Sequence, residues 1–354
     1  MKKTLVLKVD SHHPDKDKIR IAADLIKSGG LVAFPTETVY GLGANALNAE
    51  AVLALFKAKN RPLDNPPIVH VCDFKDLYTL AEEVPDEAQR LMEVFWPGPL
   101  TLVFRRSKIV PEVTVAGLDT IAIRMPRHNV ALALIRKSGC PISAPSANLA
   151  GKPSPTLAKH VLDDLSGRID AVLDAGPTRV GVESTVLDLT ADPPQILRPG
   201  GTPIEALLEV LAKVELNPTV TADKALPIEI ARSPGVKHKH YAPSADMIVV
   251  EGKAEAVAGK MEQLIGLYSE EGKTVGVLGT DETIGRFRAH AVKSMGSRSD
   301  LAGVARSLFK LLREFDFEGV DVIVAEGVPT EGIGLAVMNR LRKAAGYRII
   351  RADA

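Results

Sequence analysis

Cysteines, aromatic residues and net charge are all scarce in this sequence. Only two cysteines occur in 354 residues, and 4% of the residues are aromatic. Cys72 and Cys140 each stand alone in an apolar stretch, which is typical of buried free thiols and does not provide a metal cluster. Basic and acidic residues number 44 each, so the formal net charge is zero. Because nucleic-acid affinity comes mainly from many phosphate contacts, this balance argues against an RNA-binding coat protein.

Long apolar runs and the common nucleotide and hydrolase motifs are also missing. No apolar run is long enough to span a bilayer, and the chain turns polar again at Lys8-Val9-Asp10, which predicts no signal peptide. We therefore expect a cytoplasmic protein without membrane contact. No phosphate-binding Gly-x4-Gly-Lys-Ser/Thr loop, no Gly-x-Ser-x-Gly elbow and no His-Glu-x-x-His occurs. The run from Gly41 to Ala46 matches the loose dinucleotide pattern, but a single match is weak.

The length and the order of the predicted elements indicate two α/β domains. In residues 1–213 the strands outnumber the helices without simple alternation, which predicts a mixed, curved sheet. Prolines recur in residues 214–244, where helical periodicity is absent, so this stretch is predicted to be an ordered linker. In residues 245–354 strands and helices alternate, which predicts a smaller three-layer, Rossmann-like domain with a parallel sheet.

Polar residues follow several predicted strands of the first domain. Thr36-Glu37-Thr38 follows the strand 31–34, Arg124 ends the strand 120–123, and Ser143 lies at the end of the strand 141–144. Ser184 precedes a further strand, and Arg198 ends the next. Each residue alone is explained as well by a cap, a turn or a surface ion pair. Five such strand ends in one domain favour a shared polar pocket.

A second candidate feature is the basic cluster Lys57, Lys59 and Arg61 just before Pro62. Basic residues near the end of a helix also complement the helix dipole, so the cluster could serve only to stabilise the helix. As ligands for phosphate, lysine acts as a point charge and arginine as a bidentate fork. We expect Lys59 and Arg61 to be exposed cations that neutralise a triphosphate. His70, on the following strand, is either a contact for a polar substrate group or a satisfied core histidine.

These residues together resemble the YrdC-type threonylcarbamoyl-AMP synthases. Pro35-Thr36-Glu37-Thr38-Val39-Tyr40-Gly41-Leu42-Gly43 is similar to the opening motif of that family. Lys59-x-Arg61 and Ser146-x-Asn148 resemble its Lys-x-Arg and Ser-x-Asn signatures. The segment Ser233–Pro243 looks like the connector of the two-domain form, and the segment Gly334–Leu341 looks like the end of its C-terminal domain.

The resemblance implies a nucleotidyltransferase. The family joins L-threonine, bicarbonate or CO2, and ATP into threonylcarbamoyl-AMP and pyrophosphate, with Mg2+ accompanying ATP and without a tightly bound cofactor. A downstream transferase then passes the threonylcarbamoyl group to an adenosine of tRNA. The resemblance also implies a weak contact between the synthase itself and tRNA.

The resemblance also implies which residues of this sequence form the site. Lys59 and Arg61 are expected to be catalytic, at the phosphates, and no residue is expected to ligate a metal. The residues expected at L-threonine are Thr38, His70, Arg124, Ala144 and Ser184. The residues expected at ATP are Arg61, Asn65, Thr120, Ser146, Ser154, Arg198 and Tyr241.

Two other functions and one conformational hypothesis accompany this interpretation. An RNA-binding module without catalysis is the main alternative, although no RNP-like aromatic strand occurs. A carbamoyltransferase of metal-centre maturation would need zinc fingers, and two cysteines cannot form them.

In the linker, Tyr241 stands near Lys237 and Lys239 between Pro234 and Pro243, which suggests a stiff lid that places Tyr241 on the nucleotide. The competing reading is that Tyr241 only packs between domains.

Overall fold

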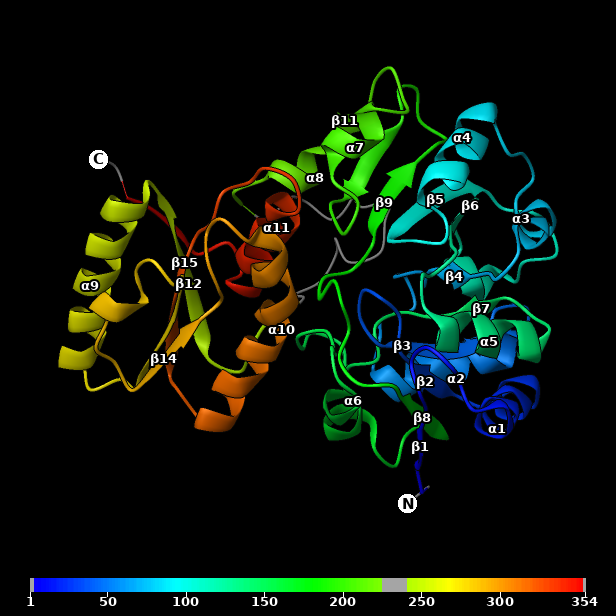
Figure 1. Ribbon diagram of the computed structural model, residues 1–354, viewed down its shortest axis with the longest axis horizontal. Coiled ribbons are helices and arrows are strands. Elements are labelled where there is room, and N and C mark those ends of the chain that lie inside the picture. The colour runs from blue at the N-terminus through cyan, green and yellow to red at the C-terminus, as the bar shows by residue number, and fades with distance from the viewer. Residues whose placement is uncertain (1–2, 225–240, 353–354) are drawn as a thin grey trace. The chain divides into compact units, whose positions relative to one another are not determined.

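The computed structural model describes residues 3–224 and 241–352, which form two compact units (Figure 1). The first unit contains residues 3–150 and 154–220, and the second contains residues 151–153, 221–224 and 241–352. Among these described residues, the helices are all too short or too polar to cross a membrane.

The first unit is built on an 11-stranded sheet with the order β1-β8-β2-β3-β7-β4-β6-β5-β9-β10-β11. The sheet contains parallel pairs such as β1 with β8 and antiparallel pairs such as β5 with β6, which confirms the predicted mixed sheet. Its strands are β1 (Leu5–Lys8), β2 (Val32–Phe34), β3 (Gly41–Asn45), β4 (Val69–His70), β5 (Leu100–Arg105), β6 (Thr120–Arg124), β7 (Ile142–Ser143), β8 (Ala171–Asp174), β9 (Thr185–Asp188), β10 (Gln195–Arg198) and β11 (Glu215–Leu216). Its helices are α1 (Lys16–Lys27), α2 (Ala49–Lys59), α3 (Phe74–Leu80), α4 (Asp86–Phe95), η1 (Glu112–Val115), α5 (Asn129–Ser138), α6 (Ala158–Leu165), α7 (Ile204–Leu208) and α8 (Pro218–Thr221).

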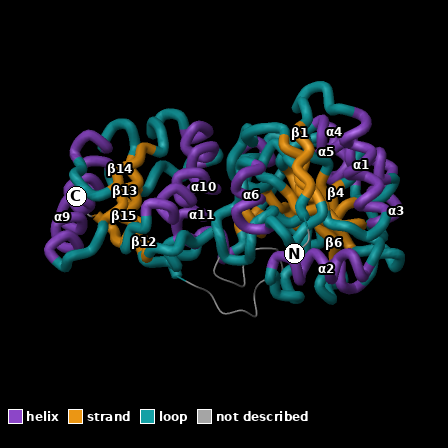
Figure 2. The backbone as a smooth tube through the Cα atoms, turned by 90° about the horizontal axis from the view of Figure 1, so that it is seen from below, coloured by secondary structure: helices purple, strands orange, loops and turns teal. Residues whose placement is uncertain are grey.

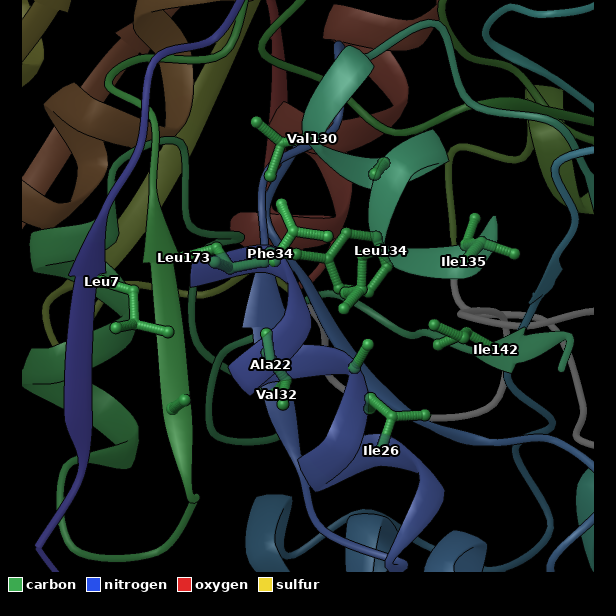
Figure 3. Close-up of a cluster of buried hydrophobic side chains, with 14 of the residues drawn as sticks. Leu7, Ala22, Ile26, Val32, Phe34, Val130, Leu134, Ile135, Ile142 and Leu173 are labelled. Carbon is green, nitrogen blue, oxygen red and sulfur yellow. The ribbon is translucent and has the colours of Figure 1, made fainter. Parts of the chain in front are cut away.

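Helix α1 forms where local sequence signals favour a helix. Asp15 caps it by accepting hydrogen bonds from the backbone amides of Asp17 and Lys18, and such a cap satisfies donors that the first turn leaves open. Its apolar stripe is buried in a core that includes Phe34 of β2 and Leu134 of α5 (Figure 3). Burying this stripe stabilises the helix more than its intrinsic propensity does.

The segment that matches the dinucleotide pattern is a strand and not a phosphate-binding loop. Residues Gly41–Asn45 form β3, which pairs antiparallel with β2. A Cβ atom on Gly43 would lie 2.9 Å from Ile142 Cγ2 and 2.9 Å from Phe34 Cε1. Glycine is therefore needed at this position because core side chains pack directly against the backbone.

The sheet continues into the segment predicted as a linker. Strand β11 (Glu215–Leu216) pairs parallel with β10, and α8 follows it. Residues 225–240, which make up most of the predicted linker 214–244, lie outside the described residues.

The second unit has a five-stranded sheet with the order β14-β13-β15-β12-β16. Every neighbouring pair is parallel, and α9 covers one face while α10 and α11 pack together on the other (Figure 2). This arrangement confirms the predicted three-layer, Rossmann-like domain. Its strands are β12 (Asp246–Gly252), β13 (Val275–Gly279), β14 (Ala291–Ser294), β15 (Val322–Glu326) and β16 (Ile349–Ala352). Its helices are α9 (Ala254–Glu270), η3 (Ile284–Arg286), α10 (Leu301–Glu318) and α11 (Gly334–Ala344).

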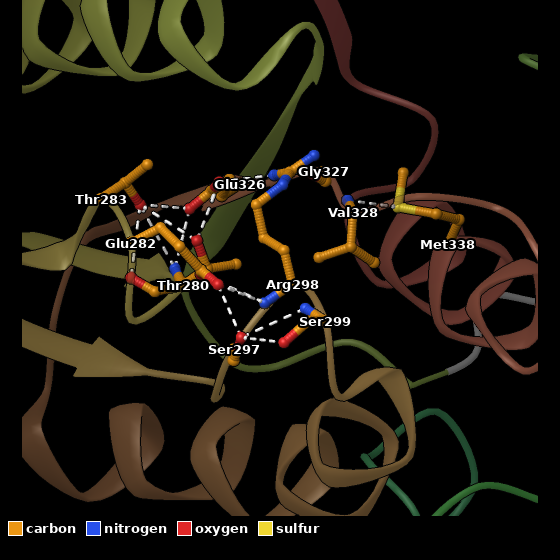
Figure 4. Close-up of polar contacts among 10 residues, drawn as sticks. All are labelled: Thr280, Glu282, Thr283, Ser297, Arg298, Ser299, Glu326, Gly327, Val328 and Met338. Carbon is orange, nitrogen blue, oxygen red and sulfur yellow. Dashed lines mark hydrogen bonds and ion pairs between the residues drawn. The ribbon is translucent and has the colours of Figure 1, made fainter.

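A buried carboxylate joins the carboxyl ends of the strands in this second sheet (Figure 4). Glu326, at the end of β15, is fully buried and accepts hydrogen bonds from the backbone amide of Thr280 at 2.7 Å and from the hydroxyl of Thr283. Arg298 Nη1 lies 2.6 Å from Glu326 Oε1 and supplies the opposite charge. Because this carboxylate is both ion-paired and hydrogen-bonded, it links the carboxyl end of β15 to the segment that follows β13.

Candidate active site

Several of the residues predicted for the site share one face of the first sheet. Thr120 and Arg124 are four residues apart on β6, so their side chains point to the same side. His70 of β4 lies directly opposite Arg124 in the register of the two strands, and residues in register share a face. We call these three residues, together with Thr38 from the loop after β2, which bonds Arg124, and Ser184 just before β9, the polar face.

Arg124 is 3% exposed and is held by three groups of the protein. Its Nε donates to the carbonyl of Gly98 at 3.1 Å, and its Nη1 donates to the Thr38 hydroxyl at 2.9 Å. Its Nη2 lies 2.6 Å from Glu37 Oε2. A guanidinium has five N–H groups. Nη2 has no hydrogen-bond partner among the described residues, so the guanidinium still has N–H groups that a ligand carboxylate could use.

His70 is buried beside Arg124 and packs edge-on against Phe34, with the two ring centroids 6.2 Å apart. Its Nδ1 lies 3.2 Å from the carbonyl of Ile68. Burial, together with the positive charge of Arg124, lowers the pKa of His70 to about 3. A neutral imidazole at this position is able to donate or accept a hydrogen bond without bringing a second cation next to Arg124.

Ser184, which directly precedes β9, is in contact with Arg198, the last residue of β10. Arg198 donates from Nε and Nη2 to the carbonyl of Ser184 at 3.1 and 3.0 Å, and Nη2 also reaches the Ser184 hydroxyl at 3.2 Å. That hydroxyl makes a 2.7 Å hydrogen bond with Thr101 of β5. A residue predicted for threonine thus lies in direct contact with a residue predicted for ATP.

Lys59 is buried, which corrects the expectation of an exposed cation. Only 1% of the residue is exposed, and its ammonium group donates to the backbone carbonyls of Ser146 and Asn148. The Lys-x-Arg and Ser-x-Asn signatures are therefore joined by these two hydrogen bonds. Its position at the end of α2 explains the burial, because the loop that carries Ser146 bridges to β3 at Gly41 and packs over this end.

Arg61 and Asn65 also lie together. Arg61 donates from Nε to the Asn65 carbonyl and from Nη2 to the Asn65 side-chain oxygen, both at 2.8 Å. Arg61 is half-buried, whereas Asn65 is 3% exposed. The two residues predicted at ATP thus brace one loop, which runs from α2 to β4.

The other predicted residues are distributed around these groups. The Ala144 amide donates to the carbonyl of Ile68 at 2.8 Å, next to His70. The Ser154 hydroxyl donates to Glu183, and both residues are buried. Tyr241 belongs to the second unit, where its ring lies 5.3 Å from Phe309 and 5.4 Å from the guanidinium of Arg340, measured to ring centroids.

Three polar residues were missed as site residues by the sequence reasoning. Glu37, Thr101 and Glu183 each contact a predicted residue, namely Arg124, Ser184 and Ser154. Glu37 stands inside the Thr36-Glu37-Thr38 run, which is the signal that could have identified it. Thr101 has no comparable signal, because only the pairing of β5 with β9 brings it to Ser184. Within residues 3–224 and 241–352, no group of three His, Cys, Asp or Glu side chains is arranged to hold a metal ion.

Two family models match this chain. The Sua5/YciO/YrdC model, described as telomere recombination, matches residues 24–200. The model of the threonylcarbamoyl-AMP synthase C-terminal domain matches residues 203–346.

Individual relatives match over nearly their whole length. Threonylcarbamoyl-AMP synthase of Pyrococcus abyssi is 55% identical over 334 residues, which cover 94% of this chain and 96% of the relative. The Bacillus subtilis protein of the same name is 50% identical over 336 residues, which cover 94% of each chain. The crystal structure of P. abyssi Sua5 complexed with L-threonine superposes with a TM-score of 0.94 and 52% identity, and the match covers 99% of this chain and 100% of the other.

Proposed function

The chain belongs to the threonylcarbamoyl-AMP synthase family, and from that premise we propose that it condenses L-threonine, bicarbonate or CO2, and ATP into threonylcarbamoyl-AMP and pyrophosphate. It is a nucleotidyltransferase, because the AMP half of ATP is transferred to a carbamate of the amino acid. The non-catalytic RNA-binding alternative is not favoured, since the full-length relatives are named as synthases.

The observation that carries this proposal is the placement of Arg124 on the polar face. Its guanidinium is buried, oriented by Thr38 and Gly98, and lies beside a neutral His70. A planar fork in a buried site suits the carboxylate of a small amino acid. In this proposal Arg124 binds the threonine carboxylate, while Thr38, His70, Ala144 and Ser184 line the rest of the threonine site.

The second half of the site binds ATP. Lys59 is the last residue of α2, Arg61 follows it, and Arg198 lies beside Ser184, so three cations are available for the phosphates. Nucleotidyl transfer needs positioning and charge neutralisation more than covalent catalysis. In this proposal Lys59 and Arg61 act at the phosphates. Further ATP contacts come from Asn65, Thr120, Ser146, Ser154, Arg198 and Tyr241.

Magnesium and the downstream partners complete the proposal. In this proposal Mg2+ enters the site together with the triphosphate of ATP. The product is a reactive mixed anhydride, so a transferase that passes the threonylcarbamoyl group to tRNA would consume it. A direct tRNA contact and the cytoplasmic location stay predictions.

The proposal is tested by measuring pyrophosphate release from ATP while threonine and bicarbonate are omitted in turn. We expect release to require both, and the nucleotide product to be threonylcarbamoyl-AMP by mass spectrometry. Release that continues without threonine would contradict the proposed reaction. Binding of tRNA without any threonine-dependent turnover would support the RNA-binding alternative instead.

A further inference from the structure

Glu37 forms a buried ion pair with Arg124, and its carboxylate can still accept a hydrogen bond. Both side chains are 4% exposed, and Glu37 Oε2 lies 2.6 Å from Arg124 Nη2. Neither carboxylate oxygen, Oε1 nor the ion-paired Oε2, has a hydrogen-bond partner among the described residues. A buried, unsatisfied carboxylate oxygen is costly, so it indicates a place where a donor from a ligand belongs.

The backbone around Glu37 holds this carboxylate in position. The Glu37 carbonyl accepts hydrogen bonds from the amides of Arg179 at 3.1 Å and Val180 at 2.8 Å, and the Thr38 carbonyl accepts from Gly181 at 3.1 Å. A site whose charged groups are fixed before the ligand arrives loses little entropy on binding. Glu37 and Arg124 therefore present one negative and one positive group in a fixed arrangement.

The charge balance of this pair decides which ligand fits. The ion pair is neutral as a whole, and the adjacent His70 is neutral as well. A ligand that carries only a carboxylate would add one negative charge to this neutral, buried ion pair, which is unfavourable. An amino acid zwitterion brings a positive and a negative charge together, so the ion pair and the ligand remain neutral as a group.

We infer that Glu37 and Arg124 together recognise the zwitterion of the amino acid substrate, with Arg124 binding the carboxylate and Glu37 Oε1 accepting the ammonium group. The inference rests on the proposed function, because it specifies how the threonine site selects its ligand. It assigns to Glu37 a binding role in addition to holding Arg124. If Glu37 served only to hold Arg124, its removal would weaken every ligand of Arg124 by the same factor.

The test compares ligands that differ only at the amine. Calorimetry on the full chain gives dissociation constants for L-threonine and for beta-hydroxybutyrate, the same skeleton without its amine. Wild-type protein should prefer threonine by about tenfold or more, as expected for a hydrogen bond between charged groups. In Glu37→Gln this preference should fall towards one, because threonine binding weakens while beta-hydroxybutyrate binding is unchanged or tighter. Glu50→Gln, at an exposed glutamate on α2, is the matched control and should keep the wild-type preference.

The outcomes separate the inference from the proposed function. An unchanged preference in Glu37→Gln, with both ligands weakened equally, would leave Glu37 as a support for Arg124 and overturn the inference. Wild-type protein that binds no threonine would instead overturn the proposed function. If Glu37→Gln does not fold, Glu37→Asp keeps the charge and should retain a preference that is reduced but greater than one. A preference of one in folded Glu37→Asp would also overturn the inference.

Discussion

His70 on β4 lies directly opposite Arg124 on β6, so a buried imidazole and a buried guanidinium are neighbours across two parallel strands. A positive charge next to His70 disfavours its protonation, and burial disfavours it further. The relationship has consequences for stability as well as for ligand binding.

We expect His70 to make the protein sensitive to acid. The folded-state pKa of His70 is about 3, below its ordinary value of 6.5. Between these values the unfolded chain binds a proton that the folded chain does not, so stability is full above about pH 6.5 and falls as the pH is lowered. His70→Asn should reduce the pH dependence of the unfolding free energy by up to about 1.4 kcal/mol per pH unit. Urea unfolding between pH 4.5 and about pH 7 checks this, with the exposed His290→Asn as the control.

We expect Lys59→Met to damage both activity and stability. Losing one preorganised cation at the phosphates should slow pyrophosphate release by about a hundredfold to a thousandfold. The carbonyls of Ser146 and Asn148 would also lose a buried donor, which should lower the unfolding free energy by about 1–3 kcal/mol. Lys57→Met, two residues earlier on the exposed side of α2, should change neither quantity. Normal turnover in a folded Lys59→Met protein would show that Lys59 only supports the loop.

We expect Arg124→Lys to raise the threonine concentration needed for half-maximal rate. Lysine keeps the charge but cannot form the planar fork, so carboxylate binding should weaken by about tenfold or more. The apparent affinity for ATP should change little. Arg127→Lys, at an exposed position of the following loop, is the control. Equal losses for threonine and ATP in steady-state kinetics would place Arg124 at the phosphates or in the scaffold.

We expect two substitutions of Tyr241 to separate packing from nucleotide binding. Tyr241→Phe keeps the ring contact with Phe309, while Tyr241→Ala removes it. If Tyr241 contacts ATP through its hydroxyl group, Tyr241→Phe should raise the KM for ATP and leave the thermal midpoint unchanged. If it only packs, Tyr241→Phe should behave like wild type and Tyr241→Ala should lower the midpoint. Steady-state kinetics and thermal unfolding of the same preparations distinguish these results.

We expect Gly43→Ala to destabilise the first unit. The added methyl group would lie 2.9 Å from both Ile142 Cγ2 and Phe34 Cε1, so the core must shift, at a cost of about 1–3 kcal/mol.

Gly259→Ala is the opposite case, because a methyl group on this residue of α9 meets open space. It should raise the stability of the second unit by about 0.5–1 kcal/mol through helix propensity. Denaturant unfolding measures both effects, and an unchanged midpoint for Gly43→Ala would show that the core relaxes without cost.

Local signals in the sequence were sufficient for many elements and for the domain classes. Ile19, Ala22 and Ile26 recur at helical spacing and form the buried side of α1, which Asp15 caps. The alternation of strands and helices predicted the parallel sheet of the second unit. Such features depend on residues within one or two turns or strands, so a short window of sequence contains the information.

The tertiary structure decided which of these residues meet. Thr38 and Arg124 are 86 residues apart, and only the sheet order brings them within 2.9 Å. Three further features depend on the tertiary structure. The glycine-rich segment forms β3, Lys59 is buried under the loop that carries Ser146, and Glu37 pairs with Arg124. Short stretches of sequence thus contain the information for the elements, the family motifs and the kinds of polar group available. The contacts among those groups depend on strand register and long-range packing, because their energies arise only after distant segments have come together.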